Sequence, residues 1–216
     1  MLSRGLRPCA GIPRQCPRQC TDTARLVEVL RVTPGQVLAD IGAGPEALLT
    51  IPMAEAVGPS GKVYATDMSQ MLGRVRETIE KSGLKNIELL EGQPSATNLP
   101  PGCCDGIFIR NVYHHLADPP AMNASVWRSL KPGGRLAVID FRPEGSEAAS
   151  PAGRDSGDQH GVLPETSREL TPNRFYPGLV RGSPGQVVHC CRGKGGQVAP
   201  HPDGASKAGQ GDEGGS

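Results

Sequence analysis

Two glycines separated by one residue follow a short apolar segment, with an acid just ahead of them. The segment Val37–Ile41 runs into Gly42-Ala-Gly44, and Asp40 lies two residues before the first glycine. Glycines permit a tight turn and let a ligand approach the backbone closely. The spacing also satisfies the loose Gly-x-Gly-x-x-Ala dinucleotide pattern, which alone is weak evidence. A carboxylate here suits a pyrophosphate poorly, so the pattern favours a ligand that carries positive charge.

A second acid follows the next apolar segment. Lys62–Thr66 ends at Asp67, and Met68 comes directly after it. An acid at the carboxyl end of a strand lies where open α/β sheets bind ligands, and there it can accept hydrogen bonds from both hydroxyls of a ribose. The apolar Met68 side chain is able to pack on an adenine face. We therefore expect Asp67 and Met68 to contact a nucleoside.

Two adjacent histidines, His114 and His115, are candidates for proton transfer. A histidine titrates near neutral pH and can deprotonate an acceptor. The structural alternative is that one ring packs against the end of the sheet while the other is solvated. Of the two we take His114 as the candidate general base.

The seven cysteines match neither a disulfide framework nor a metal site. Their number is odd and includes two adjacent pairs, which suits free thiols in a reducing compartment. Cys16 and Cys20 have no nearby histidine and no second pair at zinc spacing, so we predict no metal. Cys103-Cys104 precedes a predicted strand; two adjacent thiols can bind a soft metal or react, but a pair of turn residues is the simpler interpretation.

Alternating strands and helices must position these residues. Strands are predicted over 37–41, 62–66, 86–91, 105–111 and 135–141, and helices over 22–30, 46–57, 69–82 and 120–130. Apolar strands that alternate with helices imply a mostly parallel sheet covered on both faces. The fold class is therefore α/β, a doubly wound Rossmann-like domain.

Composition divides the chain into three parts. Of 216 residues, 29 are Gly and 21 are Pro. Residues 1–21 are Arg-rich and acid-poor and are expected to form a disordered leader, 22–144 the folded domain, and 145–216 a Gly/Pro-rich, mostly disordered tail. We expect the sheet to be incomplete after its fifth strand, because only 185–189 offers a short further strand. An unpaired edge at 135–141 would then favour edge-to-edge dimerisation.

Several ordered blocks together resemble one family. VLADIGAG, GPSGKVYATDMS, GLKNIELLEG, FIRNVYHHLADP and LKPGGRLAVIDF resemble a class I S-adenosylmethionine-dependent methyltransferase of the small-molecule, type 11-like group, from about Thr33 to Glu144. The resemblance implies a sheet with strand order 3-2-1-4-5-7-6 and S-adenosyl-L-methionine as cofactor. It also implies roles for single residues: the methionine part on Asp40, Gly42 and Gly44, the ribose on Asp67, the adenine amino group on Gln93, and the methyl acceptor near Asn111.

Three departures from the family pattern bear on function. Glu46 stands where the family's glycine loop usually has a third glycine, and Gln93 replaces an acid. After Phe141 the family needs a helix and a final antiparallel hairpin, which the Gly/Pro-rich sequence does not resemble beyond Thr171. We hypothesise a truncated, frame-shifted or alternatively ended terminus, which the nucleotide sequence would test.

Three functions compete on this reading. The leading one is methyl transfer from S-adenosylmethionine to a small-molecule acceptor. The alternatives are a non-catalytic, truncated methyltransferase-like protein and an NAD(P)-dependent oxidoreductase. The net charge of +1 argues against nucleic-acid binding through bulk charge, and no apolar run is long enough for a membrane span. We expect a cytoplasmic protein, or a mitochondrial one if the Arg-rich N-terminus is a presequence.

Overall fold

The protein is an α/β domain in which one sheet carries helices on both faces. The computed structural model describes residues 17–141, 176–181 and 186–192. Its elements in chain order are α1 (Pro17–Leu30), β1 (Val37–Ile41), α2 (Thr50–Val57), β2 (Lys62–Asp67), α3 (Ser69–Ser82), β3 (Ile87–Glu91), β4 (Cys104–Arg110), the 3-10 turn η1 (Tyr113–His115), α4 (Pro119–Ser129), β5 (Leu130–Phe141), β6 (Tyr176–Arg181) and β7 (Gln186–Arg192).

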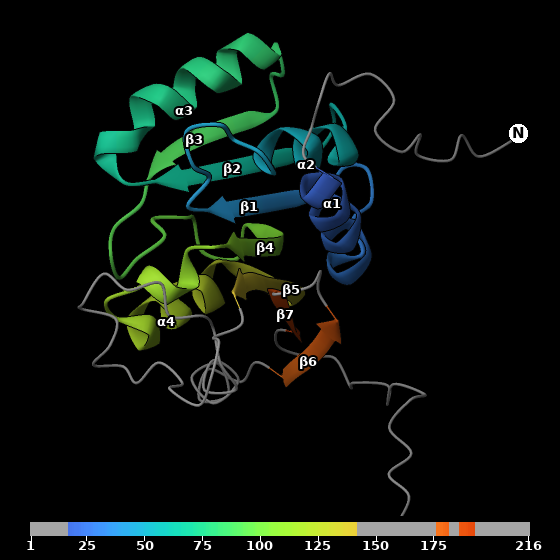
Figure 1. Ribbon diagram of the computed structural model, residues 1–216, viewed down its shortest axis with the longest axis vertical. Helices are drawn as coiled ribbons and strands as arrows, with labels where there is room; N and C mark the ends of the chain where they lie inside the picture. Colours follow the sequence, from blue (N-terminus) through green and yellow to red (C-terminus); the bar gives the residue numbers. More distant parts are fainter. Residues whose placement is uncertain (1–16, 142–175, 182–185, 193–216) are drawn as a thin grey trace, which may run out of the picture.

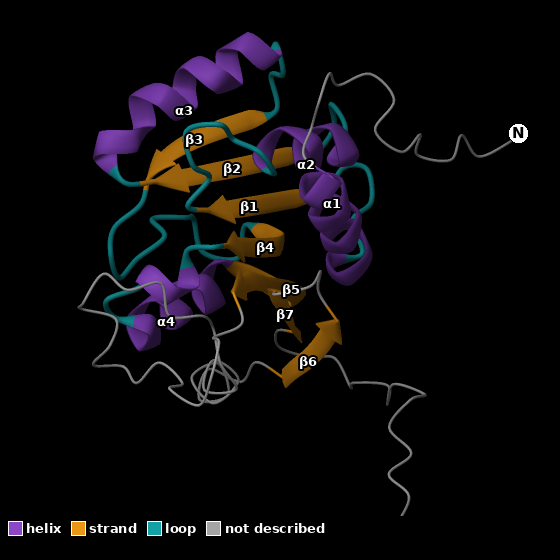
Figure 2. Cartoon of the chain, viewed as in Figure 1, coloured by secondary structure: helices purple, strands orange, loops and turns teal. Residues whose placement is uncertain are grey.

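The sheet has the order β3-β2-β1-β4-β5-β7-β6, with β3 and β6 at its edges (Figures 1 and 2). Strands β1 to β5 pair in parallel, whereas β7 pairs antiparallel with both β5 and β6. The order in which strands are added reverses at β1, because β2 and β3 lie to one side of it and β4 and β5 to the other. This reversal point is where open α/β sheets bind ligands, at the carboxyl ends of the strands.

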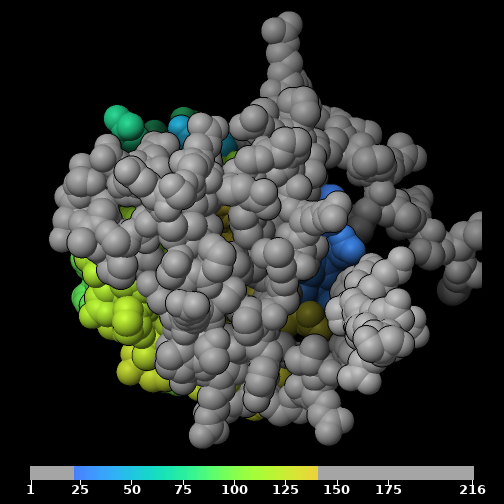
Figure 3. All heavy atoms as spheres, turned by 60° about the horizontal axis from the view of Figure 1, so that its bottom comes forward, coloured from blue at the N-terminus to red at the C-terminus, as the bar shows by residue number. Residues whose placement is uncertain are grey.

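Apolar side chains on both faces of the central strands bind the helices to the sheet. On one face Leu38, Val63 and Phe108 pack with apolar residues of α1 and α2, and α3 packs alongside through Val75 and Ile79. On the other face α4 and η1 cover the sheet. Figure 3 turns the molecule so that its lower side in Figure 1 faces the reader, and α4 forms the yellow-green surface there. Burial on both faces explains why the strands read as continuous apolar runs.

Local sequence signals end or begin several helices as expected. Gly83 stops α3 in the left-handed conformation at φ 73°, which glycine adopts without steric cost. Asp118 caps α4 by accepting a hydrogen bond from the backbone N–H of Ala121, and Pro119 occupies the first turn. No helix within the described ranges combines the length and the apolar character that crossing a membrane requires.

The α/β class, the parallel order of the first five strands and the strand order implied by the family resemblance are all confirmed. The expectation that the sheet ends after the fifth strand is wrong. Strand β7 pairs along β5 from Arg135 to Phe141, and β6 pairs with β7. Proline and glycine occur in β6, an edge strand where a missing N–H or side chain costs little. The expected edge-to-edge dimer was based on an unpaired edge of β5, and β7 occupies that edge.

Two helix boundaries also differ from the sequence-based expectation. α1 begins at Pro17, inside the predicted leader, so that Asp22 lies within the helix rather than at its start. α2 begins at Thr50 rather than at Glu46, because Ala47 adopts a left-handed φ of 46° that no α-helix contains. Over residues 1–16, 142–175 and 193–216, the expected disordered leader and tail fall outside the described residues.

Candidate functional site

The glycine turn after β1 is fixed to the end of β2 by three hydrogen bonds. The backbone N–H groups of Gly42 and Ala43 both donate to the carbonyl oxygen of Thr66, at 2.9 and 3.0 Å. The N–H of Gly44 donates to Oδ2 of Asp67 at 2.8 Å. A turn that binds pyrophosphate presents such N–H groups, together with a helix N-terminus, to its ligand. Here these donors are satisfied inside the protein, and α2 starts only at Thr50.

Gly42 is also required by its neighbour Val112. Its φ is +75°, and a Cβ atom added there would lie 2.5 Å from Cγ2 of Val112. Gly44 has a similar φ of +70°, but a Cβ there would meet nothing within 4 Å. Both glycines therefore allow the left-handed backbone, but only at Gly42 does the missing Cβ also leave room for the side chain of Val112.

We expect Gly42→Ala to lower the free energy of unfolding by about 2–4 kcal/mol, since it adds a steric clash to backbone strain. Gly44→Ala is the matched control and should cost only the strain, about 1 kcal/mol. Chemical denaturation of the two variants gives the difference, and adding Val112→Ala to Gly42→Ala should remove most of it. Equal losses in both single variants would show that the Val112 contact is unimportant.

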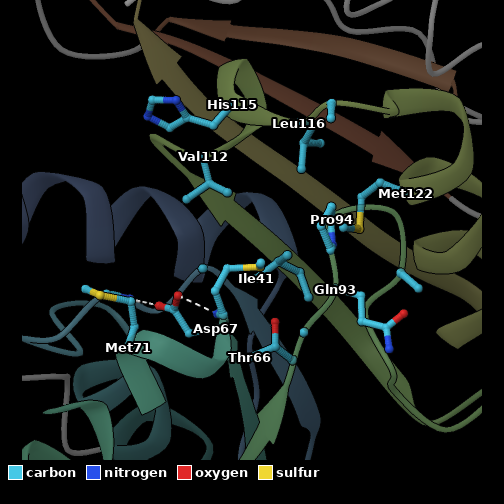
Figure 4. A pocket seen from close by; sticks show the side chains of 16 residues that line it. Ile41, Thr66, Asp67, Met71, Gln93, Pro94, Val112, His115, Leu116 and Met122 are labelled. Carbon is cyan, nitrogen blue, oxygen red and sulfur yellow. Dashed lines mark hydrogen bonds between the residues drawn. The ribbon is translucent and has the colours of Figure 1, made fainter. Parts of the chain in front are cut away.

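A cavity of about 450 Å³ opens beside this turn (Figure 4). Its walls come from the ends of β1 and β2, the start of α3, the loop after β3, and the segment from Val112 to α4. They are mainly apolar: the lining residues are Ile41, Gly42, Gly44, Thr66, Asp67, Met68, Met71, Gly92, Gln93, Pro94, Ala96, Val112, His115, Leu116, Ala117 and Met122. Such a cavity, with few polar groups, suits a flat aromatic ligand.

Asp67 is the acidic group of this cavity. Oδ2 accepts from Gly44 and Oδ1 accepts from the backbone N–H of Met68, both at 2.8 Å. Figure 4 shows the carboxylate across the cavity from Val112, His115 and Leu116. A carboxylate has about four acceptor sites, so two bonds to the backbone leave capacity for further donors. The backbone bonds hold its oxygens in place for a ligand with two hydroxyl groups.

A second, smaller cavity of about 210 Å³ lies on the other side of the glycine turn. It shares three lining residues with the larger one, Gly42, Gly44 and Val112. Its remaining lining residues are Asp40, Ala43, Glu46, Leu48, Leu49, Arg110 and Asn111. The two cavities therefore meet at the turn, with an apolar compartment on one side and a charged compartment on the other.

Asp40 is a buried acid in the smaller cavity. Burial raises the pKa of its carboxyl to about 7, and the negative charge of Asp67 adds to this. The hydroxyl of Thr50 donates to Oδ2 at 2.6 Å and, with the charge of Arg110, opposes the rise. A carboxyl group held so near its neutral form is destabilised when ionised, and a cationic ligand group placed beside it would relieve that cost.

Asn111 places a second acceptor in the same cavity. Its φ of 54° is left-handed, a conformation that asparagine tolerates better than most residues, and its N–H donates to the carbonyl oxygen of Ile139. Its Oδ1 is buried and has no hydrogen-bond partner in the described part of the chain. Buried acceptors are normally satisfied. Asp40 and Asn111 thus place two hydrogen-bond acceptors in the same small cavity.

The two histidines have different surroundings. His114 is buried, and its ring Nδ1 lies 2.7 Å from Oδ1 of Asp140. The backbone N–H of His114 donates to Oδ2 of Asp140. His114 does not line either cavity, whereas His115 lines the larger one. The two rings lie 3.9 Å apart. Burial and the neighbouring His114 lower the pKa of His115, so that its ring is neutral at pH 7 and able to accept a proton.

The structure brings most of the predicted site residues together. Asp67, Met68 and Gln93 line the larger cavity, Asp40 and Asn111 line the smaller one, and Gly42 and Gly44 line both. His114 lines neither of the two cavities. The sequence reading missed Val112, Thr50 and Arg110 and did not single out His115 over His114. The tight turn of η1 decides which of the two rings faces the cavity, and no residue type in the sequence signals it.

Comparison with known proteins finds methyltransferases with similar sequences. Residues 39–138 match the family model described as "Methyltransferase domain". A demethylmenaquinone methyltransferase of Listeria welshimeri is 33% identical over 115 residues, which cover 53% of this chain and 48% of the relative. One of Lactococcus lactis is 35% identical over 92 residues, covering 42% and 36%. The chain thus spans about half the length of the Listeria relatives it matches, or less in the Lactococcus case.

Solved structures extend the likeness to more of the chain. A SAM-dependent methyltransferase from Aquifex aeolicus aligns with a TM-score of 0.68 and 25% identity, covering 81% of this chain and 90% of its own. The [4+2]-cyclase SpnF aligns with a TM-score of 0.69 at 14% identity, covering 81% and 80%, which shows a shared fold alone. The fold therefore hosts more than one chemistry, and the reaction must be argued from the site.

Proposed function

We propose that the chain binds S-adenosyl-L-methionine and transfers its methyl group to a small-molecule acceptor, because residues 39–138 match the model of a methyltransferase domain and a SAM-dependent methyltransferase shares the fold. The observation that carries the proposal is the pair of cavities joined at Gly42, Gly44 and Val112. One is apolar with a single carboxylate. The other is polar and holds a buried acid beside an unsatisfied acceptor.

The residues present fit the chemical groups of this cofactor. Asp67 would accept hydrogen bonds from the ribose hydroxyls, and the apolar wall with Met68 and Met71 would enclose the adenine. Gln93 lines the same cavity, where its side-chain amide would read the adenine amino group. Asp40 and Oδ1 of Asn111 would accept from the ammonium of the methionine part. The cofactor itself supplies an activated methyl group on a cationic sulfur.

The same geometry disfavours a dinucleotide. The N–H groups of Gly42, Ala43 and Gly44 are already bonded to Thr66 and Asp67. A pyrophosphate at this turn would also face the carboxylates of Asp40 and Asp67, whose charge repels it. An NAD(P)-dependent oxidoreductase is therefore the weaker reading of the glycine turn.

Proton transfer, if the acceptor requires it, falls to His115 rather than to the expected His114. His115 lines the larger cavity, and its lowered pKa keeps the ring neutral. His114, bonded to Asp140, would hold the neighbouring ring in place. Methyl transfer does not always need a base, since positioning of the reacting atoms supplies much of the rate. Asn111 would contact the cofactor more directly than the acceptor.

We expect Glu46→Gly to raise the affinity for S-adenosylmethionine. Glu46 is exposed and lines the smaller cavity, where it adds a charge and a side chain beside the place proposed for the methionine part. The extra backbone freedom of glycine should also lower stability by up to about 1 kcal/mol. Glu46→Ala separates the two effects, because it removes the carboxylate without that freedom. A weaker affinity in both variants would mean that Glu46 is a ligand contact.

The acceptor is the least constrained part of the proposal. Relatives named demethylmenaquinone methyltransferase support a quinol-like acceptor, and the apolar wall of the larger cavity agrees with one.

The alternative of a non-catalytic methyltransferase-like protein is favoured by Glu46 in the smaller cavity. We keep both the cytoplasm and the mitochondrion as proposed locations.

Incubation with methyl-labelled S-adenosylmethionine and demethylmenaquinol tests the activity. We expect labelled menaquinol and an equal amount of S-adenosylhomocysteine, both lost in Asp67→Ala. Cofactor binding without product from this acceptor or from a panel of phenols and amines would support the non-catalytic alternative. Absence of cofactor binding would overturn the proposal as a whole.

A further inference from the structure

The two adjacent cysteines at the start of β4 bring their sulfur atoms together. Sγ of Cys103 lies 2.8 Å from Sγ of Cys104. Successive residues of an extended strand point to opposite faces, so adjacent cysteines within a strand hold their sulfurs apart. The approach is possible because Cys103 lies between the turn at Gly102, with φ +61°, and the first residue of the strand. The local backbone thus forms a two-sulfur group.

The two thiols differ in their surroundings. Cys104 is fully buried among apolar residues of the core, whereas Cys103 is only half-buried and so accessible to reagents. The hydrogen bond from Cys104 lowers the pKa of the Cys103 thiol, and the charge of Lys131 acts in the same direction. The same hydrogen bond, with burial, raises the pKa of Cys104. One accessible, easily ionised thiol is therefore paired with a neighbour that keeps its proton.

We propose that Cys103 and Cys104 form a bidentate site for a trivalent thiophilic centre, the chemistry of arsenite and of organoarsenic(III) compounds. Soft thiolate ligands select soft centres. Zinc requires four ligands in a structural site, but no cluster of three His, Cys, Asp or Glu side chains suited to a metal exists among the described residues. A trivalent organoarsenic centre needs only two sulfurs, and this pair supplies them.

Binding of the arsenical to the two thiols requires no oxidant. With phenylarsine oxide, two As–S bonds form while the arsenic–oxygen bond is lost. The oxygen leaves as water, taking the proton of each thiol, and arsenic remains trivalent. The more accessible Cys103 attacks first, and Cys104, whose Sγ lies 2.8 Å away, closes the ring.

The dithiol site is separate from the proposed cofactor site. Cys104 begins β4, whereas Arg110, which lines the smaller cavity, ends it. At the start of the strand, Asp105 accepts hydrogen bonds from the N–H of Val37 and from Lys131, so the dithiol lies at the amino end of the strands, opposite the carboxyl ends where the two cavities lie. We therefore expect arsenical binding to leave the affinity for S-adenosylmethionine unchanged.

Differential alkylation of the native, reduced full chain tests the site. Phenylarsine oxide is added in an excess of glutathione, followed by iodoacetamide, trypsin and mass spectrometry of the peptide spanning residues 86–110, which contains Cys103 and Cys104 and none of the other cysteines. We expect alkylation of Cys103 to be lost. Addition of 2,3-dimercaptopropanol, a competing dithiol, should restore it, whereas glutathione alone should not.

Cys104→Ala is the matched variant, since it keeps the accessible Cys103 and removes the second sulfur. We expect Cys103 to be alkylated there whether or not the arsenical is present. Circular dichroism checks the fold of this buried substitution, and Cys103→Ser, at the half-buried position, gives a second readout through loss of arsenical binding to the peptide. Full alkylation of Cys103 in the wild-type protein with arsenical present would overturn the proposal, and so would protection that persists in Cys104→Ala.

Discussion

Replacing Asp67 by alanine is expected to weaken binding of S-adenosylmethionine by at least about a hundredfold. The side chain is proposed to accept hydrogen bonds from two ribose hydroxyls, and a hydrogen bond to a charged group contributes about 1.5–3 kcal/mol. The variant also leaves the N–H groups of Gly44 and Met68 without their acceptor. The glycine turn then loses one of its three ties to β2. Isothermal titration of wild type and variant measures the change.

Two further variants separate the ribose contact from damage to the turn. Asp67→Asn keeps an acceptor oxygen without the charge and should give an intermediate affinity. Asp105→Ala, at the amino end of the strands, removes a carboxylate that likewise accepts a hydrogen bond from a backbone N–H, that of Val37. It should cost stability and leave affinity unchanged. Equal affinity in wild type and Asp67→Ala would show that the ribose assignment is wrong.

Replacing Asp40 by asparagine is expected to stabilise the ligand-free protein while weakening its binding of S-adenosylmethionine. Burial raises the pKa of Asp40 to about 7, from its ordinary value of 3.8 in the unfolded chain. Between these two pH values the folded chain keeps a proton that the unfolded chain releases. Raising the pH through this window therefore lowers the free energy of unfolding, and the loss is complete above pH 7.

The size of this effect follows from the difference between 3.8 and about 7, at about 1.4 kcal/mol for each pH unit, and amounts to about 4–5 kcal/mol. Asparagine retains an oxygen that can accept from the hydroxyl of Thr50. We expect Asp40→Asn to be more stable than wild type by this order at pH 8 and nearly equal to it at pH 4. Urea denaturation at the two pH values checks it. A stability difference between Asp40→Asn and wild type that does not grow between pH 4 and pH 8 would contradict the raised pKa of this buried carboxyl.

Binding should show the opposite trend. If Asp40 pairs with the ammonium of the methionine part, Asp40→Asn should weaken S-adenosylmethionine and leave adenosine, which lacks that group, nearly unaffected. The acid would then be a case in which local stability is given up for ligand recognition. Equal weakening of both ligands would place Asp40 outside the amino-acid compartment.

The central part of the fold could be predicted because its inner strands are short, mostly apolar runs bounded by glycines or polar residues. Val37–Ile41 is apolar except for Asp40, and the apolar part of Lys62–Thr66 lies between its two polar ends. Asp40, near the end of the first run, and Asp67, directly after the second, were recognised because they interrupt or end these runs. At the carboxyl end of a buried strand, an ionisable side chain has few structural uses.

The rest of the sheet could not be predicted because its pairing is not local. Strand β7 is flanked by glycines, and β6 contains a proline and a glycine, so neither shows a strong strand pattern. Strand β7 pairs with an edge of β5 that ends more than forty residues earlier in the chain, and β6 pairs only with β7. The sequence resemblance to a family with a final hairpin was a better guide here than composition.

Side-chain placement within the site was also beyond sequence reasoning. His114 and His115 are chemically identical neighbours, and only the turn of η1 directs His115 to the cavity. Val112 is an ordinary apolar residue whose importance comes from its contact with Gly42 across the fold. The short Sγ–Sγ distance of Cys103 and Cys104 likewise depends on a backbone turn that adjacent cysteines alone do not indicate.

Direct titration of the purified chain with S-adenosylmethionine, S-adenosylhomocysteine and NAD tests the central claim, that the joined cavities bind a methyl-donor nucleoside. Calorimetry under one buffer condition compares all three ligands. We predict binding of S-adenosylmethionine and S-adenosylhomocysteine, which share the nucleoside and the amino-acid end, and no binding of NAD. Binding of NAD without S-adenosylmethionine or S-adenosylhomocysteine would contradict the account.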